Sequence, residues 1–305
     1  MSSTPKTAHV PDRPHAHVGN NGSIGTIVDL DRYPLDRLDS TELRAAVQRC
    51  RADLQARGCS VLQGFFAPGI EGMRQEAATL APRAWFKERF GNPYSSPDDP
   101  SLPEDHPVRT FLKRDQGFVA GDLIAPTTAL RRVYHHAGFR RFIAACMELD
   151  EIHEYADPLG CLVVNVIRNG ACHPWHFDTN EFVVSALVQA PQAGGEFEYC
   201  PGIRSPENEN FERVGRVIRD EDRSEVRKLG LHPGDIQLFL GRFALHRVTQ
   251  VEGPTPRLSV IFAYAKTPGM IATADRTRHL FGRASDVHLE RSKSSRPRRA
   301  DTLID

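Results

Sequence analysis

The feature that most constrains the fold is a change of hydrophobic period half-way along the chain. After residue 160, short apolar or β-branched segments follow one another at 161–167, 181–189, 196–200, 235–240, 244–248 and 257–265. Glycine-containing turns separate them, at Asn169-Gly170, Gly194-Gly195, Pro233-Gly234 and Gly253-Pro254. Many short strands with glycine turns are typical of a β-sandwich or a β-barrel. We therefore predict a mainly β fold.

The first half of the chain shows helical spacing instead. A helix is expected between Asp39-x-x-Glu42, which resembles a capping box, and Gly58, because apolar residues recur there every three or four positions. Further helices are expected over about 70–86 and 127–149, with a long proline-rich loop over 91–126. The prediction is a helical layer over about 38–150 beside a β core over about 155–270.

The two ends of the chain differ from this middle. Residues 1–22 are polar and have no apolar core, and residues 288–305 are basic and rich in serine. Neither segment can bury much apolar surface, so both are predicted to be disordered tails. A single domain over 23–287 then remains, which is a common size for one large β domain with helices.

Charge and cysteine content exclude several classes of function. Lys and Arg number 39, and Asp and Glu also number 39, so no net field favours nucleic acid or a membrane surface. The six cysteines are scattered, without a Cys-x-x-Cys pair, which fits reduced thiols. No apolar run approaches the roughly 20 residues that span a bilayer. We expect a cytoplasmic protein that acts on a small molecule.

Three residues of the strand-rich half have the chemistry of a metal site, namely His176, Asp178 and His246. His176 and Asp178 stand two positions apart, so on a strand both would point to one face, whereas a helix would splay them by about 200°. Two imidazoles and one carboxylate leave the opposite side of a cation open, as in non-haem Fe(II) oxygenases. Zinc accepts an overlapping set of ligands and stays an alternative.

Arg257 and Ser259 follow the second histidine and would also share one strand face. A buried guanidinium needs an acidic partner. Arg257 could therefore hold the carboxylate of an acidic co-substrate through two charge-assisted hydrogen bonds, and Ser259 could donate one more. Each residue alone is more often a core or surface residue, and it is their order along the chain that favours a metal and co-substrate site.

This ordered set resembles the Fe(II)/2-oxoglutarate-dependent dioxygenases, which fold as a double-stranded β-helix. The segment Gly194–Phe197 also looks like the Gly-Gly-Glu turn that is common in these barrels. Three segments resemble the branch that contains halogenases of free amino acids and their hydroxylase relatives: Trp175–Asp178, Gly195–Tyr199 and Leu245–Thr249. The resemblance implies a cupin-like jelly roll with an N-terminal helical layer. It also implies Fe(II) on His176, Asp178 and His246, 2-oxoglutarate on Arg257, and O₂ as the oxidant.

The chain departs from the halogenases at one position of that set. Those enzymes carry a small residue where Asp178 stands, which leaves room for chloride on the iron. With Asp178 present, the resemblance implies hydroxylation of an unactivated C–H bond, or desaturation or cyclisation by the same oxidant. The substrate would be a small polar metabolite such as a free amino acid, and 2-oxoglutarate would become succinate and CO₂.

Four polar residues near the predicted strands are candidates for holding the substrate. Arg204 could pair with a substrate carboxylate and Glu198 could meet an amino group, while Asn165 and Asn180 lie on or beside strands near the metal pair. Each has a structural alternative: a loop salt bridge for Arg204, solvent exposure for Glu198 and turn hydrogen bonds for the asparagines. His173, three residues before His176, is expected in a loop, and the alternative is a position behind the metal ligands as their partner.

Other classes of protein stay open at this point. One is a cupin-type metalloenzyme that does not use 2-oxoglutarate, and another is a non-catalytic barrel that binds a ligand as a sensor or carrier. A hydroxylase of peptides or of nucleic acid is a third, although near-zero net charge argues against nucleic acid. Release of succinate coupled to product separates the oxygenase from the first two.

Overall fold

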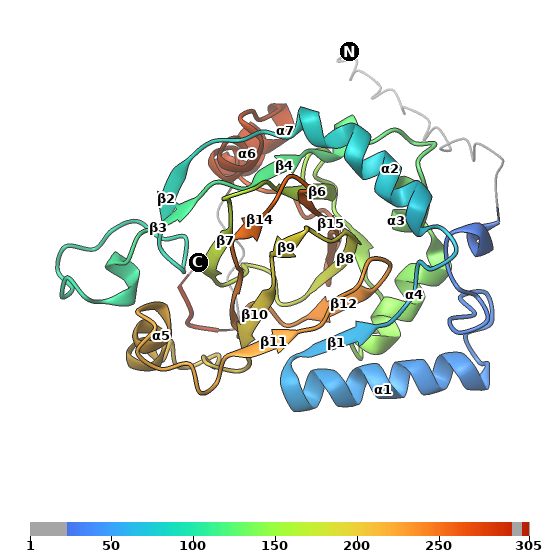
Figure 1. The fold of residues 1–305 in the computed structure, drawn as a ribbon, viewed down its shortest axis with the longest axis horizontal. Coiled ribbons are helices and arrows are strands. Elements are labelled where there is room, and N and C mark those ends of the chain that lie inside the picture. Colours follow the sequence, from blue (N-terminus) through green and yellow to red (C-terminus); the bar gives the residue numbers. More distant parts are fainter. Residues whose placement is uncertain (1–22, 295–300, 305) are drawn as a thin grey trace, which may run out of the picture.

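Two antiparallel sheets form the centre of the structure, a computed structural model that describes residues 23–294 and 301–304 (Figure 1). The larger sheet has the order β1 (Cys59–Leu62), β12 (Ile236–Phe239), β8 (Val183–Gln189), β15 (Arg257–Phe262), β6 (Leu162–Ile167) and β4 (Gly117–Val119). The smaller sheet has the order β11 (Arg227–Leu229), β10 (Phe197–Cys200), β13 (Leu245–Val248) and β7 (His173–His176). The predicted jelly-roll fold of the double-stranded β-helix type is confirmed.

The two faces of the larger sheet have different partners because side chains alternate along a strand. Leu258 and Val260 of β15 belong to one apolar cluster with the helices on the outside of the sheet. Arg257 precedes Leu258, and Ser259 lies between Leu258 and Val260. Both therefore point to the other face, into the barrel. The same alternation on β6 places Asn165 with Ser259, its partner in the register, on the inner face.

Helices of the first half cover the outer face of the larger sheet, as predicted. They are α1 (Thr41–Arg57), α2 (Ile70–Leu80), α3 (Ala129–Tyr134) and α4 (Ala137–Cys146), and Figure 1 shows α1 running beside β1. Ser40, and not Asp39, caps α1, because its Oγ accepts the amide of Leu43 at 3.2 Å. Gly58 ends this helix in the left-handed region at φ 65°, a conformation that favours glycine.

The outer face of the smaller sheet is covered separately. Trp175 of β7 and Leu245 of β13 point outward and pack with α5 (Phe211–Ile218) and with the chain around Tyr94 and Val108. That chain is part of the predicted long loop, which also contains the hairpin of β2 (Arg89–Gly91) and β3 (Leu112–Arg114). Two further strand pairs are β9 (Ala193–Gly194) with β14 (Val251–Glu252), and β5 (His153–Glu154) with β16 (Tyr264–Ala265).

Some predicted elements differ from the observed ones. The helix expected over 127–149 is two helices, because the chain breaks at His135 and His136, and the His136 ring caps α4 by accepting the amide of Phe139. The helix expected over 70–86 ends as an α-helix at Leu80. The six cysteines are free, as expected. Within the described ranges, none of the helices combines the length and hydropathy needed to cross a membrane.

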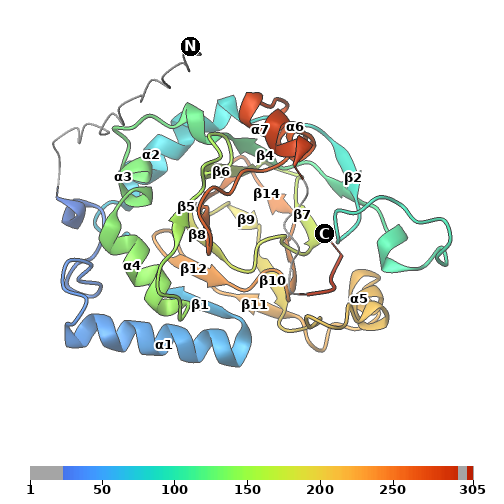
Figure 2. The same cartoon turned by 180° about the vertical axis from the view of Figure 1, so that it is seen from behind.

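The predicted disorder after residue 288 does not hold for the residues that the structure describes. Helices α6 (Ala274–Phe281) and α7 (Asp286–Lys293) pack together near β4, as Figure 2 shows from behind. His288 of α7 is fully buried and its Nε2 lies 2.9 Å from Asp157 Oδ1. The hydrophilic composition of this segment gave no sign of the contact, because a single buried histidine is enough to hold a polar helix against the fold. The predicted tail over 1–22 lies outside the described residues.

Replacing Asp157 by alanine should destabilise the fold by about 3–5 kcal/mol, because a buried partner of His288 is lost. Burial raises the pKa of Asp157, but hydrogen bonds from His288 and from the amides of Gly160, Ala272 and Leu159 outweigh it and lower that pKa. This contribution is therefore present above the ordinary pKa of 3.8 and is lost as the pH falls through the lower folded value. Urea unfolding at neutral pH measures it, with exposed Asp150→Ala as the control.

Candidate metal centre

Two histidines lie opposite each other on neighbouring strands of the smaller sheet. His176 ends β7 and His246 lies in β13, and the register pairs them. Cross-strand partners point to the same face. Their ring centroids are 4.0 Å apart, and both side chains are buried. Because the neighbouring residues Trp175 and Leu245 pack outside the sheet, the two imidazoles face the barrel interior.

Backbone carbonyls fix the tautomer of both imidazoles. Nδ1 of His176 lies 2.8 Å from the oxygen of Pro174, and Nδ1 of His246 lies 2.9 Å from that of Ala244. A carbonyl oxygen only accepts, so each Nδ1 carries a proton, and in the neutral imidazole the lone pair is then on Nε2. Burial, followed by the nearby charges of His173, His246 and Arg114, also holds the pKa of His176 well below its usual value. A neutral imidazole is the form that binds metals.

Asp178 completes a group of three donors, although it stands beyond the end of β7. Its amide donates to the oxygen of Gly241 at 3.1 Å, which fixes the turn. Its carboxylate oxygens lie 3.9 Å from His176 Nε2 and 3.4 Å from His246 Nε2. One donor atom from each of the three residues lies within 4.8 Å of the others. This arrangement fits one Fe(II) ion, because two imidazoles and one carboxylate on one side are its common donor set.

Gly241 should be needed for the position of Asp178. A Cβ at residue 241 would lie 1.9 Å from Asp178 Oδ2, so Gly241→Ala must move the carboxylate. We expect a loss of activity of about 100-fold or more, as a displacement of about 1 Å can cause, together with weaker metal binding in equilibrium dialysis. Gly230→Ala is the matched control, because a Cβ there meets no atom within 4 Å. Equal metal binding in both variants would contradict this role.

Arg257 lies in β15, on the larger sheet, and is almost completely buried. Its Nε donates to Gly195 O at 3.1 Å and its Nη1 donates to Ser259 Oγ at 3.2 Å. No carboxylate lies within ion-pair distance among the described residues, and burial alone lowers its pKa to about 10. A buried guanidinium without an acid is costly. The arrangement therefore fits an acidic ligand in the barrel.

The glycine turn before β10 supports this arginine. Gly194 and Gly195 both have positive φ angles, 64° and 62°, which favour glycine. A Cβ at Gly195 would lie 3.2 Å from Arg257 Cδ and 2.8 Å from Pro191 Cγ. The Gly194-Gly195 pair that is part of the family resemblance therefore has a steric reason. The backbone passes close to Arg257, whose Nε donates a hydrogen bond to Gly195 O.

Two further buried arginines lie in the β2–β3 hairpin, and sequence analysis missed them. Arg89 and Arg114 are direct cross-strand partners. Like charges in this position repel each other, yet both residues are buried and neither has an ion pair with a described carboxylate. Arg114 donates to Asn92 O at 3.0 Å, while its Nε and the Nε and Nη1 of Arg89 have no hydrogen-bond partner. Both guanidiniums are therefore suited to bind anions.

His173 belongs to this site, and not to a loop as expected. His176 pairs with His246 and His173 pairs with Val248, so β7 has one more residue between the two pairs than β13 has. This irregularity is a β-bulge. The extra residue turns His173 to the same face as His176, and the two rings stack with centroids 3.8 Å apart. Burial, followed by Arg114, His246, Arg89 and Arg257, holds the pKa of His173 well below its usual value.

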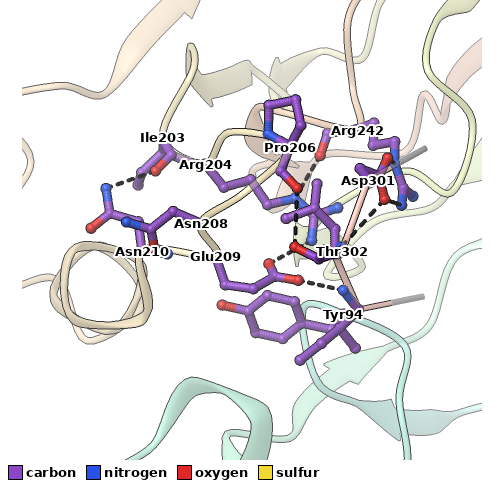
Figure 3. A network of polar contacts seen from close by, with 12 residues as sticks. Tyr94, Ile203, Arg204, Pro206, Asn208, Glu209, Asn210, Arg242, Asp301 and Thr302 are labelled. Atoms are coloured by element: carbon purple, nitrogen blue, oxygen red, sulfur yellow. Dashed lines mark hydrogen bonds and ion pairs between the residues drawn. The ribbon is translucent and has the colours of Figure 1, made fainter. Parts of the chain in front are cut away.

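Arg204 has a structural partner in place of the predicted substrate carboxylate (Figure 3). Its Nη1 lies 2.8 Å from Glu209 Oε2, and its Nε donates to Arg242 O at 2.6 Å. Its guanidinium carbon also lies 3.8 Å from the centre of the Phe177 ring, on the outer side of the smaller sheet. The structural alternative, a salt bridge, is the one observed.

The same network holds the C-terminal residues. Figure 3 shows Arg242, which is fully buried, beside Asp301, and two guanidinium nitrogens donate to its carboxylate at 2.6 Å. Thr302 N donates to Pro206 O at 3.0 Å. Since Arg242 follows Gly241, this docking site is next to the turn that holds Asp178.

The other three substrate candidates have different surroundings. Glu198 is buried but points outward, where its carboxylate accepts from Arg223 at 2.8 Å and Arg247 at 2.7 Å, so the substrate contact predicted for it does not fit. Asn180 is half-buried in the turn after Asp178. Asn165 faces the barrel interior, and its buried Oδ1 has no hydrogen-bond partner. Of the four, Asn165 is best placed for a ligand.

Comparisons with known proteins add a family to this geometry. A model of the family described as halogenase D matches residues 113–279, which include the three donors and Arg257. Among curated proteins, the sequence finds no match. The fold and site define an Fe(II)- and 2-oxoglutarate-dependent oxygenase. Because the match covers more than half of the 305 residues, the chain belongs to the halogenase D family.

Several solved structures are similar to this chain over about three quarters of its length. An oxidoreductase of the 2OG-Fe(II) oxygenase family from Burkholderia pseudomallei is 16% identical, with a TM-score of 0.46, over 73% of this chain and 92% of that one. The 2-oxoglutarate-dependent epimerase SnoN of nogalamycin biosynthesis is 16% identical, with a TM-score of 0.49, over 75% and 82%. A Pseudomonas putida prolyl-4-hydroxylase is 14% identical, with a TM-score of 0.41, over 72% and 96%. At these values none assigns an activity to this chain.

Proposed function

We propose that this protein hydroxylates an unactivated C–H bond of a small polar metabolite, such as a free amino acid, and converts 2-oxoglutarate to succinate and CO₂. The observation that carries the proposal is the convergence of His176, Asp178 and His246 with an unpaired buried arginine on the facing sheet. Three donors and one guanidinium match the needs of a cation and a dicarboxylic co-substrate.

In this proposal His176, Asp178 and His246 ligate Fe(II). When bound, the iron supplies the oxidising chemistry with O₂ and 2-oxoglutarate. The protein orients the ligands: the Pro174 and Ala244 carbonyls hold the two imidazoles with Nε2 toward the cation. The cluster of Phe197, Tyr199, Phe239 and Val248 lies behind them and keeps water away from that side of the site.

Arg257 holds the distal carboxylate of 2-oxoglutarate, with Ser259 beside it. The Ser259 hydroxyl accepts from Arg257 and can donate its own hydrogen to the same carboxylate. Asn165, opposite Ser259 in the register, offers an unpaired amide oxygen on the same inner face. It suits a hydrogen-bond donor on the co-substrate or the substrate.

Arg114 is the group that we assign to the substrate carboxylate. Its guanidinium is buried, has no ion pair with a described carboxylate, and is close enough to Asp178 for that charge to oppose the lowering of its pKa. Burial and the neighbouring Arg89 and Arg276 nevertheless lower this pKa to about 10. A carboxylate bound here would compensate the charge and lie beside the metal ligands.

Asp178 favours hydroxylation over halogenation. The halogenases that the chain resembles carry a small residue at this position, where chloride reaches the iron. Here a carboxylate stands 3.4 Å from His246 Nε2 and is fixed by the Gly241 turn. The position that a halide would take is therefore filled.

The proposal is tested by screening the free amino acids with Fe(II), ascorbate and 2-oxoglutarate in buffer that contains chloride. We expect succinate to form with a subset of them, in amounts equal to a product that has gained one oxygen atom. A product that has gained chlorine would reassign the enzyme as a halogenase despite Asp178. Iron uptake without succinate from any compound would favour the ligand-binding barrel, and product without succinate the cupin-type enzyme.

A further inference from the structure

A second polar pocket lies beside the β2–β3 hairpin, apart from the metal ligands. It has a volume of about 260 Å³ and is lined by Lys87, Arg89, Asp275, Arg278 and His279. Three cations face one carboxylate, and Asp275 already pairs with Arg278 at 3.4 Å. The lining therefore has an excess of positive charge, and such a concave, cationic site concentrates anions.

Arg89 gives this pocket a buried cation in addition to its exposed charges. The residue is only 9% exposed, and two of its guanidinium nitrogens have no hydrogen-bond partner within the described part of the chain. Burial lowers its pKa, and its cross-strand partner is another cation, Arg114. Arg89 lines the pocket, whereas Arg114 does not. Two guanidiniums that face different spaces call for two separate anionic groups.

Three side-chain contacts lie between the pocket and the metal centre. The guanidinium carbon of Arg89 lies 6.0 Å from the centre of the Phe118 ring. The Phe118 ring meets the ring of His173 edge-on with centroids 6.4 Å apart, and His173 stacks on the metal-site His176 at 3.8 Å. Arg89 and Arg114 are direct cross-strand partners, so an anion bound by each would lie close enough to the other for one molecule to carry both.

We propose that this pocket binds a second anionic group of the substrate, a phosphate or a second carboxylate, through Arg89 and Lys87. The inference rests on the proposed function and deepens it, because it makes the substrate an acidic metabolite with two anionic ends. Arg89 provides the buried bidentate contact and Lys87, which is exposed at the rim, adds a mobile charge. His279, whose pKa is lowered to about 4 by burial and by the nearby Arg89, Arg114, Arg276 and Lys87, is neutral at pH 7 and can hydrogen-bond to the anion.

The first experiment uses binding alone, with inorganic phosphate as the probe. Thermal unfolding of the iron-free full chain is followed with phosphate and with chloride at equal ionic strength. Phosphate stabilises folded proteins in general, so the measured quantity is the difference between wild type and variant. We expect an extra rise of the midpoint in the wild type that Arg89→Gln and Lys87→Gln lose. Lys228→Gln, an exposed lysine on β11, is the control that keeps it.

The second experiment compares substrate pairs that differ in one anionic group. O-phospho-L-serine is set against L-serine, and L-glutamate against L-glutamine, with succinate formation as the readout. If the pocket binds a phosphate, O-phospho-L-serine should be preferred over L-serine. If it binds a carboxylate, L-glutamate should be preferred over L-glutamine. Arg89→Gln should lower kcat/KM for the preferred acidic member by about 30-fold or more, as the loss of a buried charge partner does, and should lower kcat/KM for the neutral member far less.

Two outcomes would overturn the inference: phosphate that stabilises Arg89→Gln as much as the wild type, or neutral members that are used as well as their acidic partners. The pocket and the proposed function can fail separately. If no compound yields succinate while the phosphate difference between wild type and Arg89→Gln persists, the anion site stands and the oxygenase activity is refuted. Lys87→Gln keeps the test valid if Arg89→Gln does not fold, because Lys87 is exposed.

Discussion

His176→Ala and His246→Ala are each expected to abolish turnover. Each removes one of the two imidazole donors of the proposed metal site, and the remaining donors are one imidazole and one carboxylate. Both side chains also meet other rings at the site, so a change in fold must be excluded by circular dichroism. The decisive measurements are succinate formation and Fe(II) binding by equilibrium dialysis, and both should fall together.

His232→Ala is the matched control for these two variants. Its side chain is 81% exposed and it stands before β12, outside the barrel. We expect wild-type metal binding and turnover from it. Full activity in His246→Ala, or iron binding unchanged in either metal-site variant, would refute the assignment of the triad.

Arg257→Met should raise the dissociation constant of 2-oxoglutarate by about 30-fold to several thousand-fold. This range corresponds to the 2–5 kcal/mol that loss of one partner of a buried charge pair costs. The unliganded protein should not become less stable, because Arg257 is buried without an ion pair to any described carboxylate and methionine removes an uncompensated charge. Co-substrate should stabilise the wild type against heat by mass action and the variant far less.

Calorimetric titration and thermal unfolding measure these two effects independently of turnover. Arg283→Met serves as the control, since Arg283 is half-exposed and pairs with Asp122 far from the barrel interior. An unchanged affinity for 2-oxoglutarate in Arg257→Met would remove this residue from the co-substrate site.

The grouping of His176, Asp178 and His246 could be predicted because these residues obey local rules. The spacing of two between His176 and Asp178, and between Arg257 and Ser259, encodes a shared face on a strand. His176 and His246 then meet because their strands are neighbours in the smaller sheet. For Asp178 the local reason was incomplete, since it lies beyond β7 and is placed by the turn at Gly241.

The substrate contacts could not be predicted in the same way. Glu198 and Arg204 are charged residues near the right strands, but Glu198 faces outward and Arg204 is paired with Glu209. Whether a charge finds a partner depends on residues far away along the chain, such as Arg223 and Arg247 for Glu198.

Arg89 and Arg114 were missed for a related reason. They lie in the segment that looked like a proline-rich loop, and a short hairpin there has no strong hydrophobic alternation. Their significance is visible only when burial and the lack of an acidic partner are known. A sequence shows the charge of a residue, whereas its desolvation is a property of the fold.

The extra residue in β7 has a consequence for how this chain can change by insertion or deletion. Removing a single amino acid between His173 and His176 would restore regular pairing and leave both imidazoles on the inner face, because residues two apart on a strand share a face. Point substitutions nearby leave the path of the backbone intact. A deletion of one residue should therefore disturb the two imidazoles less here than in a regular strand, where it would turn one of them to the other face.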